Sequence, residues 1–146
     1  MFPDADRVTE FVPERIWTKR VPLQFLGLPM GARMTIIRLR EGGLFIHSPV
    51  PLDDTTRREI DALGPVRCVV APNRLHHLSI GDYATAYPAA RIYASPKLVD
   101  KRKDVAFHGI LGDAPESEWA DEIDQVILHG SLYMDEVIFC DVPGRT

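Results

Sequence analysis

Short apolar runs separated by turn residues fill the chain beyond residue 33, and they predict a domain built on a sheet. β-Branched and aromatic residues dominate positions 34–39 (MTIIRL) and 44–47 (LFIH), and the segment between them ends in two glycines. Apolar runs joined by a short glycine turn are typical of a β-hairpin. Residues 1–32 carry four prolines among scattered apolar residues. We therefore expect an irregular lead-in there, with at most a short strand around Arg15–Thr18.

The segment that follows predicts a strand–helix–strand unit. The run DDTT at 53–56 supplies a helix N-cap, Glu59 stands at capping-box spacing from Thr56, and Gly64-Pro65 ends the pattern, so we expect a helix over 54–63. The continuous apolar run at 66–71 (VRCVVA) is typical of a strand buried on both faces. Crossovers of this kind join parallel strands and are right-handed. Strands 44–47 and 66–71 are therefore predicted to be parallel, with the helix on one face.

The remaining pattern continues the alternation of strands and helices. It predicts a helix over 78–87, a strand over 91–94, mostly loop over 96–122 with a helical turn near 96–100, strands over 125–129 and 136–142, and a turn at 143–146. Such alternation favours an α/β architecture.

Composition narrows the class of protein. The chain has 146 residues, 17 Lys+Arg against 21 Asp+Glu and a net charge of −4, so one domain over 1–146 is expected and a nucleic-acid partner is not. No apolar run reaches the ~20 residues that span a bilayer, and the polar start differs from a signal peptide. We therefore expect a cytoplasmic protein without a membrane partner. Cys68 and Cys140 both lie in apolar stretches, which predicts two reduced, buried thiols.

Polar residues follow two of the predicted parallel strands. His47-Ser48 ends one strand, and Pro72-Asn73-Arg74-Leu75-His76-His77 follows the other. The carboxyl ends of parallel strands share one sheet edge, where ligands bind in open α/β sheets. Adjacent imidazoles suit a zinc ion, and Asn73 with Arg74 would orient an anion. Alternatively, one histidine bonds the helix terminus while the other is solvated, and His47 and His129 are hydrogen-bonded residues at strand ends.

The segments RMTIIRL, LFIHSPVPLDD, GPVRCVVAPNRLHHL, GDYATAYPAARIYASPKL and EVIFCDVPGRT resemble a family of uncharacterised bacterial proteins related to the metallo-β-lactamase superfamily. The resemblance covers residue 33 to the end. It implies an αββα sandwich (α/β, or α+β in some schemes) that begins with antiparallel strands. Loops at one edge of its two sheets would hold one or two zinc or iron ions. Because the superfamily's next strand, ending in a metal-bridging Asp, is missing, the chain would be the front portion of that fold.

The superfamily's main metal motif, H-x-H-x-D-H, matches this chain only in part. With its last His on His77, the motif's Asp falls on His76, its second His on Arg74 and its first on Pro72. His47 stands where relatives often have the Asp of an I-D-x-G strand end. The closing PGRT resembles the ligand loop P-G-H-T. We interpret that match as false, since chain order puts the ligand loop near 128–134 and makes His129 the nearest candidate.

Two functions follow from these expectations. The first is a metal-dependent hydrolase that binds one divalent metal, zinc or another, through His76 and His77, with His129 or His47 as the third ligand, and acts on an unknown small molecule. The second is a non-catalytic relative that binds a small anionic ligand or a protein partner at the same edge, through Asn73, Arg74, Ser48 and the histidines. A homodimer joined through unpaired strands is a further alternative.

Overall fold

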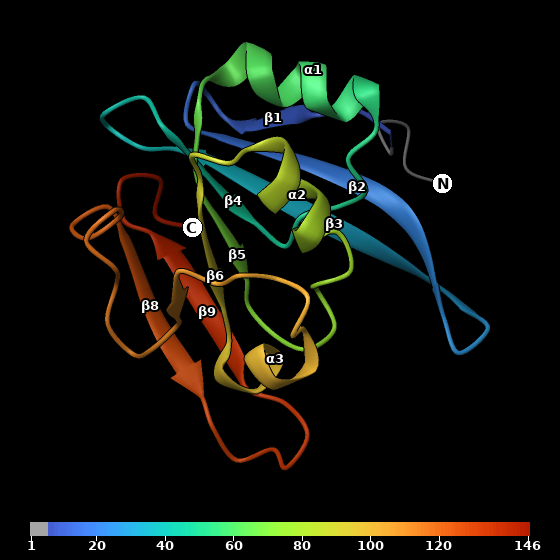
Figure 1. Ribbon diagram of the computed structural model, residues 1–146. Helices are drawn as coiled ribbons and strands as arrows, with labels where there is room; N and C mark the ends of the chain where they lie inside the picture. Colours follow the sequence, from blue (N-terminus) through green and yellow to red (C-terminus); the bar gives the residue numbers. More distant parts are fainter. Residues whose placement is uncertain (1–5) are drawn as a thin grey trace.

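The computed structural model describes residues 6–146 and contains one large sheet, one small sheet and three helices (Figure 1). The elements are β1 (Thr9–Val12), β2 (Ile16–Phe25), β3 (Leu28–Arg38), β4 (Leu44–His47), α1 (Asp54–Leu63), β5 (Val66–Ala71), α2 (Ile80–Ala86), β6 (Arg91–Ala94), α3 (Pro96–Lys101), β7 (Gly109–Ile110), β8 (Ile123–Leu128) and β9 (Glu136–Asp141). The large sheet follows chain order from β1 to β7, antiparallel up to β4 and parallel from there on, while β8 and β9 pair antiparallel by themselves.

Alternation along the central strands divides the core into two layers. Leu44 and Ile46 of β4 point to the side of the sheet covered by the helices, where they pack with Ile60 of α1 and Tyr83 of α2. Phe45 points to the other side and joins the layer formed with β8 and β9. The main sheet therefore lies between helices and a second small sheet, and the expected mixed α/β sandwich class is confirmed.

The strand–helix–strand prediction is confirmed in detail. β4, α1 and β5 have the predicted bounds, and β4 pairs parallel with β5, which pairs parallel with β6. Asp53 caps α1 by accepting a hydrogen bond from the backbone N of Thr56 at 2.7 Å. The capping box proposed for Thr56 and Glu59 is wrong, because the Glu59 carboxylate accepts a hydrogen bond from Lys19 instead.

The irregular lead-in predicted for residues 1–32 is wrong over the described part. β2 and β3 form a ten-pair antiparallel ladder from Ile16↔Ile37 to Phe25↔Leu28. A buried lysine hid the alternation, since Lys19 is 3% exposed and donates to Thr56 Oγ1 at 2.7 Å. The prolines misled too, because Pro22 and Pro29 both stand inside the ladder, at positions where no ladder N–H is required.

The bounds of β8 and β9 agree with the predicted strands to within two residues.

The prediction that both thiols are buried holds for only one of the two cysteines. Cys68 is buried, as expected, whereas Cys140 is exposed. Cys140 alternates with buried Asp141 along β9 and lies on the same exposed face as Ile138, which points away from the core. Among the described residues, no helix is long and apolar enough to cross a membrane.

Candidate functional site

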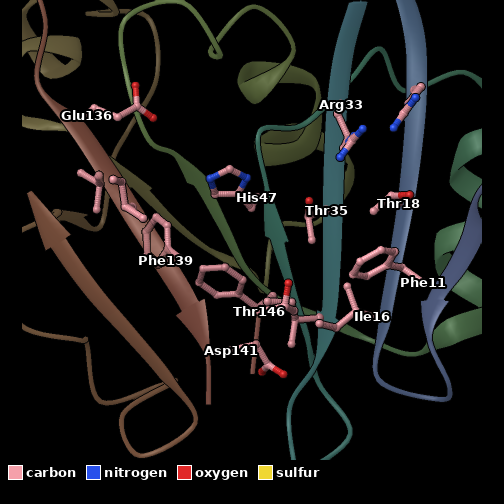
Figure 2. Close-up of a pocket in the computed structure, with 15 residues that line it drawn as sticks. Phe11, Ile16, Thr18, Arg33, Thr35, His47, Glu136, Phe139, Asp141 and Thr146 are labelled. Atoms are coloured by element: carbon pink, nitrogen blue, oxygen red, sulfur yellow. The ribbon is translucent and has the colours of Figure 1, made fainter. Parts of the chain in front are cut away.

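An open cleft of about 410 Å³ lies between the large sheet and β9 (Figure 2). One wall consists of the residues of β2, β3 and β4 that face away from the helices, and the other wall is β9. The lining residues are Phe11, Ile16, Thr18, Arg20, Arg33, Thr35, Ile37, Phe45, His47, Glu136, Val137, Ile138, Phe139, Asp141 and Thr146.

Polar side chains form two rows across the strands of the first wall. Thr18 pairs with Thr35, and Thr35 pairs on its other side with His47, so these three residues make one row over β2, β3 and β4. Arg20 and Arg33 are direct cross-strand partners in the neighbouring row. Figure 2 shows Arg33, Thr35 and His47 along the same wall. The site thus offers guanidinium, hydroxyl and imidazole groups side by side.

Aromatic and aliphatic side chains line the rest of the cleft. Phe45 and Phe139 meet edge to face, with ring centroids 5.4 Å apart. The His47 ring meets Phe139 in the same manner at 5.5 Å. Ile16 and Ile37, a cross-strand pair, continue this apolar surface below the threonines. A ligand in the cleft would therefore contact polar groups at one end and apolar groups at the other.

His47 is held in its neutral form. His47 is half-buried, and its side chain borders the cleft. Burial, with a smaller contribution from the charge of His76, lowers the pKa of His47 to about 4. The imidazole therefore carries no charge at neutral pH and offers one hydrogen-bond donor and one acceptor.

The two acids of the cleft are bound by groups outside it. Glu136 Oε2 accepts a hydrogen bond from Asn73 Nδ2 at 2.7 Å. Asp141 accepts hydrogen bonds from Arg15 and from the backbone N of Gly144. Asp141 is therefore paired with a cation, whereas the neutral amide of Asn73 does not neutralise the Glu136 carboxylate, so the positive groups of the cleft lie on the wall formed by β2 and β3.

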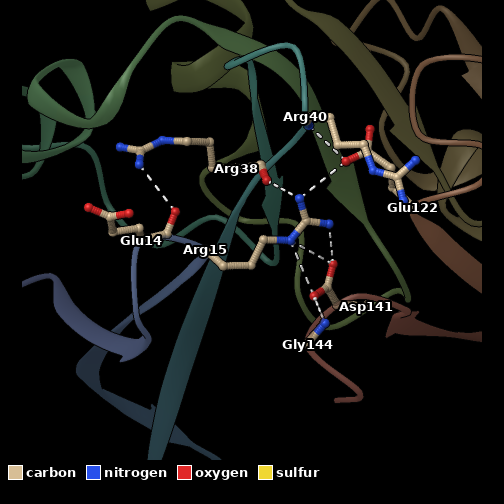
Figure 3. A network of polar contacts seen from close by, with 7 residues as sticks. All are labelled: Glu14, Arg15, Arg38, Arg40, Glu122, Asp141 and Gly144. Carbon is tan, nitrogen blue, oxygen red and sulfur yellow. Dashed lines mark hydrogen bonds and ion pairs between the residues drawn. The ribbon is translucent and has the colours of Figure 1, made fainter.

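Arg15 joins the two sheets at the Asp141 end of the cleft (Figure 3). Its guanidinium contacts Asp141 Oδ1 at 2.5 Å and Glu122 Oε1 at 3.1 Å, and it also donates to the carbonyl oxygen of Arg38. Glu122 also accepts from the backbone N of Arg40 at 2.7 Å. The network thus fixes β9 against β2 and β3 and sets the width of the cleft.

The histidine pair of the 72–77 loop does not converge on one point. The backbone N of His76 donates to Asn73 Oδ1, and the side chain lies close enough to affect the pKa of His47. His77 is buried against Arg102, whose guanidinium donates to the His77 carbonyl at 2.7 Å and lies 3.2 Å from its Nδ1. Burial, followed by Lys101 and Arg102, lowers the pKa of His77 to about 4.

The residues expected to bind an anion all make hydrogen bonds within the protein. Asn73 Oδ1 accepts from the backbone N of Leu75 at 2.8 Å, which shapes the loop. Arg74 donates to the carbonyl oxygen of Tyr133 at 3.0 Å. Ser48 is buried at φ 56°, and its backbone N donates to the carbonyl oxygen of Val70. These three residues support the loop edge around the cleft and do not line it.

His129 lies in the loop after β8, and its side chain is 65% exposed. Its Nδ1 is 3.9 Å from Asp135 Oδ1, and the same oxygen is 3.3 Å from Lys97 Nζ.

The 143–146 turn follows β9, and the backbone N of Gly144 donates a hydrogen bond to Asp141. It therefore lies at the opposite end of that strand from Glu136.

Comparison with known proteins places the chain in a family. A family model described as a domain of unknown function, DUF4336, matches residues 13–143. The chain belongs to this DUF4336 family. No curated protein matches it.

Metallo-β-lactamases are among the solved structures that share the fold of this chain. The enzyme from Pontibacter korlensis has a TM-score of 0.68 at 11% identity, over 92% of the DUF4336 chain and 66% of its own. The enzyme from Hirschia baltica has a TM-score of 0.70 at 11% sequence identity, and the match covers 95% of the DUF4336 chain and 68% of the enzyme. FIM-1 from Pseudomonas aeruginosa, in a mono-zinc form, has a TM-score of 0.60 at 14% sequence identity, and the match covers 94% of the DUF4336 chain and 66% of FIM-1. The DUF4336 chain thus spans about two thirds of the length of these proteins and shares their fold.

The donor set of the DUF4336 chain does not fit a zinc centre. Catalytic zinc sites need three protein ligands around one point, and residues 6–146 contain no group of three or more His, Cys, Asp or Glu side chains placed to hold a metal. His77 lies beside the positive charges of Lys101 and Arg102, which oppose a second cation. The four histidines predicted as ligands are therefore not assembled into one site here.

Sequence reasoning missed the arginine and threonine rows. One signal was present: Ile16-x-Thr18-x-Arg20 and Arg33-x-Thr35-x-Ile37 are mirror images. Such symmetry is what two strands of one hairpin show when cross-strand partners are alike. Reading it would have placed the turn at 26–27 and these residues on one face.

Proposed function

We propose that this DUF4336 chain is a ligand-binding domain of the metallo-β-lactamase fold that holds a small organic anion in the cleft without hydrolysing it. The observation that carries the proposal is the Arg20–Arg33 cross-strand pair, which faces the cleft beside the Thr18–Thr35–His47 row. This is the second of the two functions expected from the sequence, with its binding groups moved from the loop to the sheet.

The arginine pair favours an anion. Like charges directly opposite each other on neighbouring strands destabilise a sheet, and an anion bound between Arg20 and Arg33 would reverse that effect. The planar guanidinium group matches a carboxylate or phosphate with two parallel hydrogen bonds. The hydroxyls of Thr18 and Thr35 and the neutral imidazole of His47 add donors without adding charge.

The apolar half of the cleft favours an organic molecule over a bare inorganic anion. Ligand sites are typically clefts of about 300–1,000 Å³ lined by apolar side chains with a few polar groups. A volume of about 410 Å³ with Phe45 and Phe139 in the lining fits that description. An aromatic or aliphatic carboxylate or phosphate monoester is the chemical class that matches both halves.

Metal-dependent hydrolysis, the activity suggested by the fold, has less support in this chain. The Nδ1 atom of His77 lies 3.2 Å from the Arg102 guanidinium, and the Nδ1 atom of His129 lies 3.9 Å from Asp135 Oδ1. An anion bound in the cleft would leave both of these contacts intact.

Thermal unfolding in the presence of a chelator tests the proposal. Phenyl phosphate and benzoate should raise the unfolding midpoint of the protein, whereas benzyl alcohol, a neutral molecule of similar shape, should not. A ligand at 100 times its Kd stabilises the folded state by about 2.7 kcal/mol. Equal shifts with the alcohol and the anions would exclude a site that selects for charge.

Two variants test whether the anion binds at the arginine row. Arg33→Gln should weaken anion binding about ten- to a hundred-fold, the worth of a charged hydrogen bond. Arg58→Gln on α1, an exposed arginine on the helix side of the sheet, should bind as the wild type does. If both variants bind alike, the arginine row is not the site.

Elemental analysis of protein purified without an affinity tag distinguishes a metal-dependent hydrolase from an anion-binding domain. Stoichiometric zinc, iron or manganese that is lost in His77→Ala would favour the hydrolase and overturn the binding proposal. Less than stoichiometric metal, together with anion binding in chelator, would support the proposal.

A further inference from the structure

The β2–β3 hairpin extends beyond the sheet as a two-stranded arm. β1 pairs only with Thr18, Trp17 and Ile16 of β2, and β4 pairs only with residues 35–38 of β3. Within residues 6–146, the pairs from Lys19↔Met34 to Phe25↔Leu28 therefore have no further strand on either side. We name residues 19–34 the β2–β3 arm, and Figure 1 shows it projecting from the body of the molecule.

The tip of this arm is apolar and exposed. The exposed fractions are 45% for Phe25, 87% for Leu26, 63% for Leu28 and 53% for Met30. Leu26 and Gly27 form the turn at φ 50° and 78°, a conformation for which Asn-Gly or Gly-Gly is preferred. Leucine at the first of these positions is unfavourable both for the backbone and for solvation, so a contact made by its side chain is the simplest reason for its presence.

The edges of the arm lack hydrogen-bond donors where other hairpins have them. In a hairpin with a two-residue turn, the pair that flanks the turn is hydrogen-bonded and the next pair points its N–H groups outward. Gln24↔Pro29 and Pro22↔Gly31 are such outward pairs. Two of these four residues are prolines, which have no N–H. The arm is thus a poor partner for strand addition and leaves few donors to desolvate in an apolar medium.

Charge along the arm is positive in an acidic protein. Residues 20–33 contain two arginines and no Asp or Glu, although the whole chain carries a net charge of −4. Arg20 and Arg33 face each other five pairs behind the pair that flanks the turn, which is about 17 Å at ~3.4 Å per residue.

We propose that the β2–β3 arm docks on an anionic lipid bilayer, with residues 25–30 inserted at the interface and Arg20 and Arg33 directed to lipid phosphates. Interfacial segments bury their apolar side chains about 5–10 Å below the headgroup boundary. That depth brings the arginine side chains to a headgroup layer about 5–8 Å thick. The contact is peripheral, and it replaces the expectation from the sequence that the chain has no membrane partner.

A protein partner fits the arm less well. Stable protein interfaces use about 20–30 residues a side, whereas this tip presents four large exposed apolar side chains. The edge prolines also oppose pairing with a strand of another chain or of a second copy. Lipid insertion requires neither shape complementarity nor a free strand edge.

Flotation with phospholipid vesicles tests the proposal, and Leu26→Asn is the decisive variant. The wild type should bind vesicles that contain phosphatidylserine more tightly than pure phosphatidylcholine, by about five-fold for each arginine near the surface. Leu26→Asn should weaken binding about ten-fold. Asparagine is also the preferred residue at this turn position, so the variant should unfold at the same temperature or higher, and lost binding cannot be attributed to misfolding.

Leu132→Asn is the matched control, because Leu132 is 88% exposed but lies in the loop between β8 and β9. It should bind vesicles as the wild type does. No binding by the wild type, or equal losses in the two variants, would overturn the proposal. So would a wild-type dimer in size-exclusion chromatography that Leu26→Asn dissociates, since the tip would then contact a second copy. Neither Leu26 nor Leu132 lines the cleft, so the comparison of Leu26→Asn with Leu132→Asn is independent of anion binding there, whereas the preference for phosphatidylserine depends on Arg20 and Arg33, which also line the cleft.

Discussion

Replacing Arg15 with methionine should destabilise the protein by several kcal/mol, because the change strands two buried acids. The Asp141 side chain is fully buried and the Glu122 side chain is 10% exposed, and both pair with Arg15, which is itself 15% exposed. Methionine keeps most of the apolar stem of arginine, so the packing of the site changes little. The lost ion pairs therefore dominate the effect.

The magnitude follows from the burial of the partners. Removing one member of a buried, hydrogen-bonded ion pair costs about 3–5 kcal/mol, because the remaining charge loses its compensation in a medium of low dielectric constant. A typical domain is stable by about 5–15 kcal/mol, so Arg15→Met should remove a large part of the total. Arg15→Lys should cost less, because the charge remains while the fork of hydrogen bonds to Asp141 is lost.

Urea denaturation of the wild type and a matched variant measures the effect. Arg67 and Glu41 form an ion pair at 2.9 Å whose side chains are 48% and 45% exposed. Arg67→Met should change the free energy of unfolding by no more than about 1 kcal/mol. If Arg15→Met costs no more than Arg67→Met, the buried network does not hold the two sheets together and the reasoning is wrong.

Adding Glu122→Gln and Asp141→Asn to Arg15→Met provides a second check. The triple variant has no stranded charge, so it should recover part of the stability lost in the single variant. A triple variant less stable than Arg15→Met would mean that the acids stabilise the fold without their partner.

Three further predictions concern other parts of the molecule. His47 and His77 have pKa values of about 4 in the folded protein, below the ordinary value of 6.5. Between pH 4 and 6.5 the unfolded chain therefore binds more protons than the folded chain. The free energy of unfolding should fall by about 1 kcal/mol or more per histidine as the pH drops from about 6.5 to 4. Proton NMR of the imidazole signals against pH checks this, and titration of both rings near 6.5 would contradict it. A thiol reagent should modify exposed Cys140 and leave Cys68 unreacted in the folded state, because burial raises the pKa of Cys68 to about 12; mass spectrometry after digestion would identify the labelled residue. Asp53→Ala should lower the free energy of unfolding by about 1 kcal/mol through loss of the α1 cap, and an unchanged urea midpoint would show that the cap adds nothing.

The cleft explains why the candidate site was only partly predictable. The edge at the end of β4 and β5 was found from the sequence, because parallel strands joined by a helix must end on the same side. His47 was found with it. The arginine and threonine rows were missed, because a buried Lys19 and two prolines hide the alternation of β2 and β3.

The sequence by itself determined the parts of this protein whose cause is local. The bounds of β4, α1 and β5 follow from apolar runs, a cap and a Gly-Pro stop, all within a few residues of one another. Tertiary structure decided which of the side chains at the predicted edge lie together. His76 and His77 are neighbours in sequence, yet one lies near His47 and the other is bound by Arg102, a partner 25 residues away. Hydrogen bonds between distant segments fix the direction of each side chain, and no pattern along the chain encodes them.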